Sequence, residues 1–215
     1  MAIRNNINNK TEDITIDPGA SGNAIFKYAA ATVDFFATGV EDADDSYRIA
    51  PASTVGAGDI YITTSAGEIT MPLQPAVLTD AHTEDANVTG DGTAYTVAFP
   101  DEIFDQNNDF ATPTFTAPVD GRYHIQVELQ VQNGATGGNV ESVNIVTSNR
   151  TYYVRSLPCN EQLAGFLGPN AWIGITNTCF ADMDATDTVT IAWTSTGGAK
   201  VDDVKRQSFR CLLVC

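Results

Sequence analysis

One stretch of the chain, residues 123–131, reads Tyr-His-Ile-Gln-Val-Glu-Leu-Gln-Val. Large apolar residues alternate with polar ones along it, and a period of two is typical of a β-strand with one buried and one solvent-facing side. Residues 187–193 show the same alternation, and clusters of Gly, Asn and Asp separate such stretches, which favours turns. The sequence therefore predicts an all-β protein, with a spacing that favours a sandwich or barrel.

Shorter alternating runs on both sides extend this prediction. The glycine-containing stretch Glu161–Leu167 resembles a helix weakly, and we expect it to form a loop. The further predicted strands are Asp13–Asp17, Asn23–Ala29, Thr32–Ala37, Ser46–Ile49, Asp59–Thr64, Ser142–Ser148, Thr151–Ser156, Trp172–Thr178 and Ser208–Val214.

A change in composition divides the chain. Two prolines interrupt residues 71–75, and residues 79–93 are polar and acidic, as in a linker or exposed loop. We therefore expect a β-rich N-terminal attachment stem at residues 1–93, with a linker at 72–93, and a head domain at 94–215. The stem is poor in large aliphatic residues, so it needs the second domain or other copies for stability, and oligomerisation is favoured.

The charge balance excludes several partners. The net charge is −16, which disfavours nucleic acid and anionic membranes because both are negatively charged. No apolar run reaches the roughly 18 residues of a membrane span, so no membrane insertion is expected, and the first residues lack the pattern of a secretory signal.

The four cysteines, Cys159, Cys179, Cys211 and Cys215, lack paired C-x-x-C spacing. On one strand Cys211 and Cys215 would lie about 13 Å apart, too far for a disulfide. Free buried thiols are favoured, and a bridge between Cys159 and Cys179 stays open.

Two segments carry a resemblance to a known fold. Residues 95–110 read Tyr-Thr-Val-Ala-Phe-Pro-Asp-Glu-Ile-Phe-Asp-Gln-Asn-Asn-Asp-Phe, and residues 115–123 read Phe-Thr-Ala-Pro-Val-Asp-Gly-Arg-Tyr. They resemble the trimeric head shared by the complement first-component q-subunit and the tumour necrosis factor superfamily. The resemblance implies a jelly-roll β-sandwich that forms a homotrimer. Ile125 and Cys211 depart from the family's usual Phe and Gly, and no collagen repeat precedes the head.

A second resemblance concerns residues 13–17, 57–64 and 67–75, which are similar to segments of virion proteins of aquatic phages. It implies a virion protein assembled in the host cytoplasm. We expect a fibre or spike whose head binds a host surface receptor or glycan, while its N-terminal region contacts other virion proteins. A trimeric capsid decoration (cement) protein that stabilises the shell is the alternative, and a polysaccharide-cleaving fibre enzyme is a third class.

Catalysis is not expected. The two histidines, His82 and His124, stand in no recognisable nucleophile motif. Asp105, Asn107 and Asp109 match the opening of a calcium loop, but Phe110 occupies the position of the required Gly and no acid follows at the twelfth position. An Asx-rich turn is therefore favoured. These three residues remain weak candidates for a structural Ca²⁺, and no other cofactor is expected.

The acidic segment Glu41–Asp45 is expected to be a solvated loop, or to hold a cation between subunits. We expect recognition in the loops at 132–139, 158–170 and 195–206. The candidate receptor contacts are Lys200, Lys205 and Arg206, a basic cluster, and Trp172, a platform for a sugar ring or else a core residue. The aromatics expected to line a trimer axis in part are Tyr95, Phe99, Phe104, Phe115, Tyr123 and Phe209.

Overall fold

The structure is a computed structural model, and it describes residues 22–30, 33–52, 54–56, 58–132, 140–157 and 172–215. All regular elements in these ranges are β-strands, which confirms the all-β prediction. No helix among them is long and apolar enough to cross a membrane. The strand expected at Asp13–Asp17, the helix-like stretch at Glu161–Leu167 and most of two expected recognition loops lie outside the described residues.

The chain divides into two compact units, one ending at Leu73 and the other beginning at Gln74. The strands of the first unit are β1 (Ala24–Ala30), β2 (Val33–Glu41), β3 (Ser46–Ala50), β4 (Tyr61–Thr63) and β5 (Ile69–Thr70). They form one antiparallel sheet in which each strand pairs with its neighbour in the chain. Its small core consists of Ala37, Ala50 and Val55, with Ile25 and Ala52 partly buried against them.

The second unit is a sandwich of two sheets. Its strands are β6 (Ala76–Ala81), β7 (Asp85–Thr89), β8 (Tyr95–Thr96), β9 (Glu102–Asp105), β10 (Phe110–Ala111), β11 (Thr114–Thr116), β12 (Gly121–Gln132), β13 (Val140–Thr147), β14 (Thr151–Leu157), β15 (Ile173–Met183), β16 (Thr188–Thr196) and β17 (Asp202–Leu213). The β12 sheet has the order β15-β12-β17-β6-β9, and β7 also pairs with β17. The β16 sheet has the order β10-β11-β16-β13-β14, and β8 also pairs with β16.

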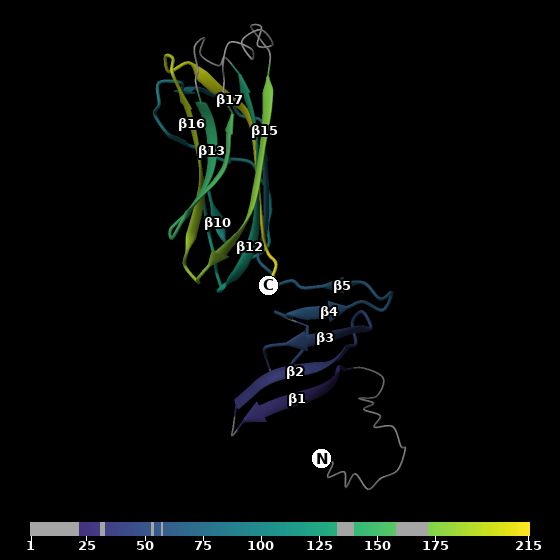
Figure 1. Cartoon of the computed structure of the whole chain (residues 1–215). Coiled ribbons are helices and arrows are strands. Elements are labelled where there is room, and N and C mark those ends of the chain that lie inside the picture. The colour runs from purple at the N-terminus through teal and green to yellow at the C-terminus, as the bar shows by residue number, and fades with distance from the viewer. Residues whose placement is uncertain (1–21, 31–32, 53, 57, 133–139, 158–171) are drawn as a thin grey trace. The chain divides into compact units, whose positions relative to one another are not determined.

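The strand order defines a jelly roll. From β11 onward the chain crosses repeatedly between the two sheets: β12, β15 and β17 join the β12 sheet, while β13, β14 and β16 join the other. Figure 1 shows β13 and β16 in one layer and β12, β15 and β17 in the second. The jelly-roll β-sandwich that the resemblance implied is therefore the fold of this unit.

The alternation in β12 places its odd-numbered residues inside the sandwich. Tyr123, Ile125 and Leu129 are buried, as are Ile191 and Trp193 on β16. The aromatics expected at a trimer axis mostly fill this core instead, because the gap between two sheets of one copy is large enough to take them. The fully buried ones are Phe99, Phe115, Tyr123 and Phe209.

The observed boundary between the units differs from the expected one at residue 94. β6 and β7 lie in the segment expected to be a linker, and both pair with β17. Their inward side chains, among them Val77, Thr79 and Ala81, are buried. This polar and acidic segment is therefore an integral part of the sandwich.

Candidate functional site

The outer face of the β12 sheet, turned away from the sandwich core, carries apolar side chains at positions where solvent-facing residues are normally polar. His124 pairs with Phe180 on β15 and with Leu212 on β17, and Leu212 pairs with Ala76 on β6. Phe180 is 65% exposed and Leu212 is 42% exposed. The rings of His124 and Phe180 lie 5.1 Å apart between centroids. One cross-strand row thus presents an aromatic and aliphatic surface to solvent.

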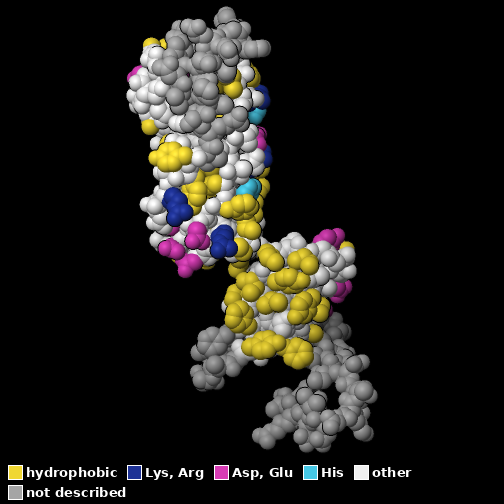
Figure 2. Space-filling model, in the orientation of Figure 1, with side chains coloured by type: hydrophobic (Ala, Val, Ile, Leu, Met, Phe, Trp, Pro, Cys, Tyr) yellow, Lys and Arg dark blue, Asp and Glu magenta, His cyan; other side chains and the backbone are white. Residues whose placement is uncertain are grey.

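The adjacent row continues this surface toward β9. Arg210 pairs with Leu78, and Leu78 pairs with Phe104, which is 47% exposed. The guanidinium Nη1 of Arg210 lies 3.6 Å from Glu128 Oε1, so the one charge within this row faces a carboxylate. We call Phe180, Leu212, Ala76, Leu78 and Phe104 the apolar rows. In Figure 2, hydrophobic and histidine side chains lie side by side along one edge of the sandwich.

The other end of the same face is polar and hollowed. An open groove of about 340 Å³ lies over β6, β12, β15 and β17. His82 Nε2 and Asp80 Oδ2 in its lining are 3.7 Å apart, and both side chains are more than half exposed. We call this feature the polar groove. Its lining includes Asp80, His82, Glu128, Thr176, Arg206 and Ser208.

Two of the four candidate receptor contacts meet beside the polar groove. The Arg206 Cζ atom lies 5.8 Å from the centroid of the Trp172 ring, within the range of a cation–π contact. The indole Nε1 of Trp172 donates a hydrogen bond to Gln132 Oε1 at 3.1 Å, which fixes the ring. Trp172 is 53% exposed, so it is a surface platform and not a core residue.

Within the basic cluster expected from Lys200, Lys205 and Arg206, Lys205 is engaged with acids of its own chain. Lys205 pairs with Glu84 and lies 3.7 Å from Asp203, and the hydrogen bond to Glu84 raises the pKa of Lys205. The register of β17 shifts between residues 204 and 206, which leaves Lys205 out of the pairing with β12. Lys200 is exposed in the turn before β17. Residues 202–206 are also a strand, not part of a recognition loop.

The calcium candidates form a turn between β9 and β10. Asp105 Oδ2 accepts a hydrogen bond from the Phe110 amide at 2.8 Å. Burial, followed by the nearby negative charge of Asp105, raises the pKa of Asp109, while a hydrogen bond from Asn107 opposes the rise. In the described part of the chain, no three His, Cys, Asp or Glu side chains converge as metal ligands. The hydrogen bond from the Phe110 amide to Asp105 closes this turn between the two strands.

The thiols of β15 and β17 flank the same core residue. Cys179 and Cys211 both pair with Ile125, and both are free thiols, as is the exposed Cys215. Burial raises the pKa of Cys179 to about 11 and the pKa of Cys211 well above its ordinary value. Both thiols are therefore protonated and unreactive at neutral pH. Cys159 lies outside the described residues.

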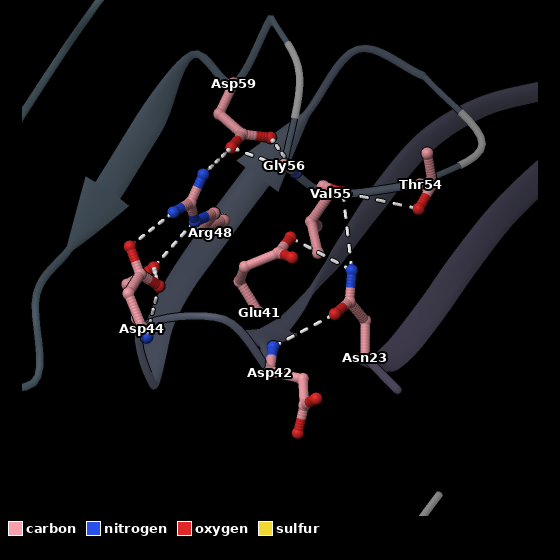
Figure 3. Close-up of polar contacts among 10 residues, drawn as sticks. Asn23, Glu41, Asp42, Asp44, Arg48, Thr54, Val55, Gly56 and Asp59 are labelled. Carbon is pink, nitrogen blue, oxygen red and sulfur yellow. Dashed lines mark hydrogen bonds and ion pairs between the residues drawn. The ribbon is translucent and has the colours of Figure 1, made fainter. Parts of the chain in front are cut away.

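The acidic segment at residues 41–45 forms a network within the first unit (Figure 3). Arg48 bridges Asp59 and Asp44, with Nη–Oδ distances of 2.8 and 2.5 Å. The buried Asp59 also accepts the Gly56 amide at 3.1 Å. Asn23 donates to Glu41 Oε2 at 2.9 Å. Residues 42–45 form an exposed turn, as expected of a solvated acidic loop, while Glu41 and Asp44 are also engaged with an amide and an arginine of the same chain.

Comparison with known proteins gives no family model that matches and no curated protein that matches. Among solved structures, the globular domain of zebrafish complement 1qA protein is 17% identical, covering 66% of this chain and 98% of that one, with a TM-score of 0.44. The PRD1 vertex protein P5 is 11% identical, covering 66% and 97%, with a TM-score of 0.38. Murine APRIL at pH 5.0 is 7% identical, covering 66% and 99%, with a TM-score of 0.43. The jelly-roll assignment rests on the strand order above.

Proposed function

We propose that the chain is a non-enzymatic structural protein of a phage particle, a trimeric fibre or spike that binds the host surface. The observation that carries the proposal is the set of apolar rows on the outer face of the β12 sheet. Large apolar side chains gathered on a sheet face, beside polar positions, mark a protein–protein contact. The resemblance of residues 57–64 and 67–75 to phage virion segments supports the location, and that of residues 95–123 supports three copies.

Electrostatics favours this face for contact between copies. With a net charge of −16, identical chains repel one another over most of their surface. The apolar rows offer a contact with few charges, and the single guanidinium of Arg210 is already opposed by Glu128. Burying Phe180 and Leu212 would contribute roughly 1–2 kcal/mol for each side chain. A heterologous contact of this kind closes into a ring when the rotation between copies is 120°.

The polar groove supports the host-binding part of the proposal. Sugars are bound by an aromatic ring under their apolar face and by planar polar side chains around their hydroxyls. Trp172, held by Gln132 and faced by Arg206, supplies the ring. Glu128 and Asp80 supply acceptors in the adjoining groove, and the exposed Thr176 supplies a hydroxyl. We therefore assign glycan contact to this end of the face and self-association to the apolar rows.

Native mass measurement tests the assembly. The full chain should have the mass of three copies. The double variant Phe180→Asp and Leu212→Asp should dissociate at protein concentrations at which the wild-type assembly stays intact. Tyr153→Asp is the matched control, because Tyr153 is an aromatic that is 83% exposed on β14, in the other sheet. A wild-type chain that is monomeric at every micromolar concentration would contradict the proposal.

Imaging of labelled particles separates the fibre from the decoration alternative. A label at a tail or vertex position supports host attachment, whereas a label on the capsid lattice at quasi-three-fold positions supports a cement protein. A turnover assay on host glycans tests the enzymatic class. Release of glycan product by the purified chain would support that class and contradict the proposal.

A further inference from the structure

Among the residues that the structure describes, nothing covers one face of the sheet of the first unit. By register, Phe26 and Tyr28 on β1 lie beside Phe36 and Val40 on β2, and Val40 lies beside Tyr47 on β3. The same face continues through Thr63 to Ile69. Six large side chains on it are between 41% and 59% exposed, and Figure 2 shows a broad hydrophobic surface over these strands. We call Phe26, Tyr28, Phe36, Val40, Tyr47 and Ile69 the bare face.

The opposite face is covered from within the unit. Ala37 and Ala50 point to it and are fully buried beneath Val55, which lies between β3 and β4. The Arg48 bridge to Asp44 and Asp59 ties the connection between β3 and β4 to that side (Figure 3). Gly39 is on this side as well, because it lies between Thr38 and Val40 on β2 and pairs with Arg48. The described part of the unit therefore has a covering layer on one side of the sheet only.

With one face uncovered, the sheet leaves its large apolar side chains in contact with solvent. The internal core has three small buried residues, whereas the bare face carries four aromatic and two aliphatic side chains. Stable domains consist of at least two packed layers, so the large apolar side chains need a partner layer. An exposed aromatic surface of this kind marks a contact site.

The chemistry of the bare face selects its partner. Its described register positions hold no Asp, Glu, Lys, Arg or His: they are Ala24, Phe26, Tyr28, Phe36, Thr38, Val40, Tyr47, Ile49, Tyr61, Thr63 and Ile69. In a chain with a charge of −16, an uncharged surface is where identical copies meet without like-charge repulsion. A basic partner, which the acidic chain would otherwise attract, finds no carboxylate on this face.

We propose that the bare face packs against the bare faces of two neighbouring copies, so that three sheets enclose a common apolar core. The inference rests on the proposed trimer, because assembly of the sandwiches holds the three first units at high effective concentration. It goes beyond that function by assigning a second self-association surface, on a different sheet and with different residues. The first unit then gains its second packed layer from the other two copies.

Hydroxyl-radical footprinting of the full chain tests this packing, since it reports solvent access to Phe and Tyr side chains. In the trimer, Phe26 and Tyr47 should react several-fold more slowly than Tyr153, the exposed reference. Dilution to single chains should restore their reactivity. Tyr28→Lys with Phe36→Lys should restore it within the trimer, whereas Ala66→Lys, in the exposed turn between β4 and β5, should not.

Mass and footprint together separate the two proposals. A particle of three chains in which Phe26 reacts as fast as Tyr153 overturns this inference alone. Protection that persists in diluted single chains, or that arises only on the phage particle, also overturns it, because the cover is then the same chain or another virion protein. A single chain at every concentration overturns both proposals. A trimer that survives Phe180→Asp and Leu212→Asp but not Tyr28→Lys and Phe36→Lys supports the bare face and contradicts the apolar rows.

Discussion

His124 lies directly across from Phe180 on the neighbouring strand, with ring centroids 5.1 Å apart on the outer face of the β12 sheet. The imidazole Nε2 is also 2.8 Å from Thr178 Oγ1, whose hydroxyl contacts the Ile125 carbonyl oxygen at 3.0 Å. The ring pair is therefore fixed by a polar contact on one side while its aromatic faces stay available for packing. This geometry holds the two rings together as one exposed pair on the outer face.

Phe180→Ala and His124→Ala should each weaken the proposed trimer, by about 1 kcal/mol per contact, because each removes a ring from the outer face of the β12 sheet. The double variant should lose less than the sum, since each single change already removes the ring contact. The free energy of association of each variant is obtained by diluting the protein and monitoring its dissociation by native mass measurement. Tyr153→Ala should change none of them, and additive losses would contradict the pairing.

Host adsorption should depend on Trp172 and Arg206 and not on Lys200 or Lys205. Trp172→Ala and Arg206→Glu remove the platform and its cation–π partner, so binding of the purified trimer to host cells should fall at least tenfold. Lys200→Glu leaves the platform untouched and serves as the control for the change of charge. Lys205→Glu should adsorb normally but unfold at a lower temperature, because the new carboxylate faces Glu84 and Asp203. Normal adsorption by Trp172→Ala would remove the groove from the binding surface.

Asp109→Asn should stabilise the chain at neutral pH. Burial raises the pKa of Asp109, so the native state holds a proton that the unfolded chain has lost. Stability therefore falls as pH rises from the unfolded pKa to the raised native pKa, and above it the charged carboxylate remains unfavourable. The variant should flatten this acid-range dependence and raise the Tm at pH 7 by up to about 3 °C.

Calcium provides the second arm of that experiment. If the turn held Ca²⁺, adding CaCl₂ would raise the Tm of the wild-type chain and not of Asp109→Asn. We expect equal melting with and without the ion, in keeping with a turn stabilised by hydrogen bonds.

Truncation should distinguish the two domain boundaries. A fragment of residues 74–215 keeps β6 and β7 and should fold as the sandwich, whereas a fragment of residues 94–215 should not. Without β6, the Phe209 amide loses Thr79 Oγ1, 3.0 Å away, and the inner strand β17 becomes an open edge. Circular dichroism melts of the two fragments measure the difference, and a cooperative transition for residues 94–215 would contradict it. Residues 74–215 should also fail to enter particles if the first unit carries the attachment.

The alternation of apolar and polar residues predicted most strands of the sandwich, because the apolar positions of each core strand are its buried positions. The alternation at 123–131 and 187–193 corresponds to β12 and β16, whose inward residues are buried. β6 was missed because its pattern, with Thr79 at an inward position and Asp80 outside, resembles a polar connection. Only its pairing with β17, about 130 positions away, makes it a strand, and no local pattern carries that information.

The contact surfaces were harder to predict for the same reason. Phe180 and Leu212 are single apolar residues at solvent-facing positions, far apart in the sequence, and only the register around His124 brings them together. Aromatic content alone suggested Phe99 and Phe209, whose tilted rings pack in the core with their centroids 5.5 Å apart. The sequence left Trp172 open between a surface platform and a core position, and the register that brings it to Arg206, like the bulge that takes Lys205 out of the pairing with β12, has no sequence signal.

The position of β17 between β12 and β6 has a consequence for synthesis on the ribosome. The strands of the first unit pair only with their neighbours, so that sheet can form as soon as it emerges. The sandwich has to wait for its last strand, because β17 joins β12 to β6 and β7. Until then each nascent chain presents an aromatic sheet without a finished head, and neighbouring chains on one polysome are exposed to premature association.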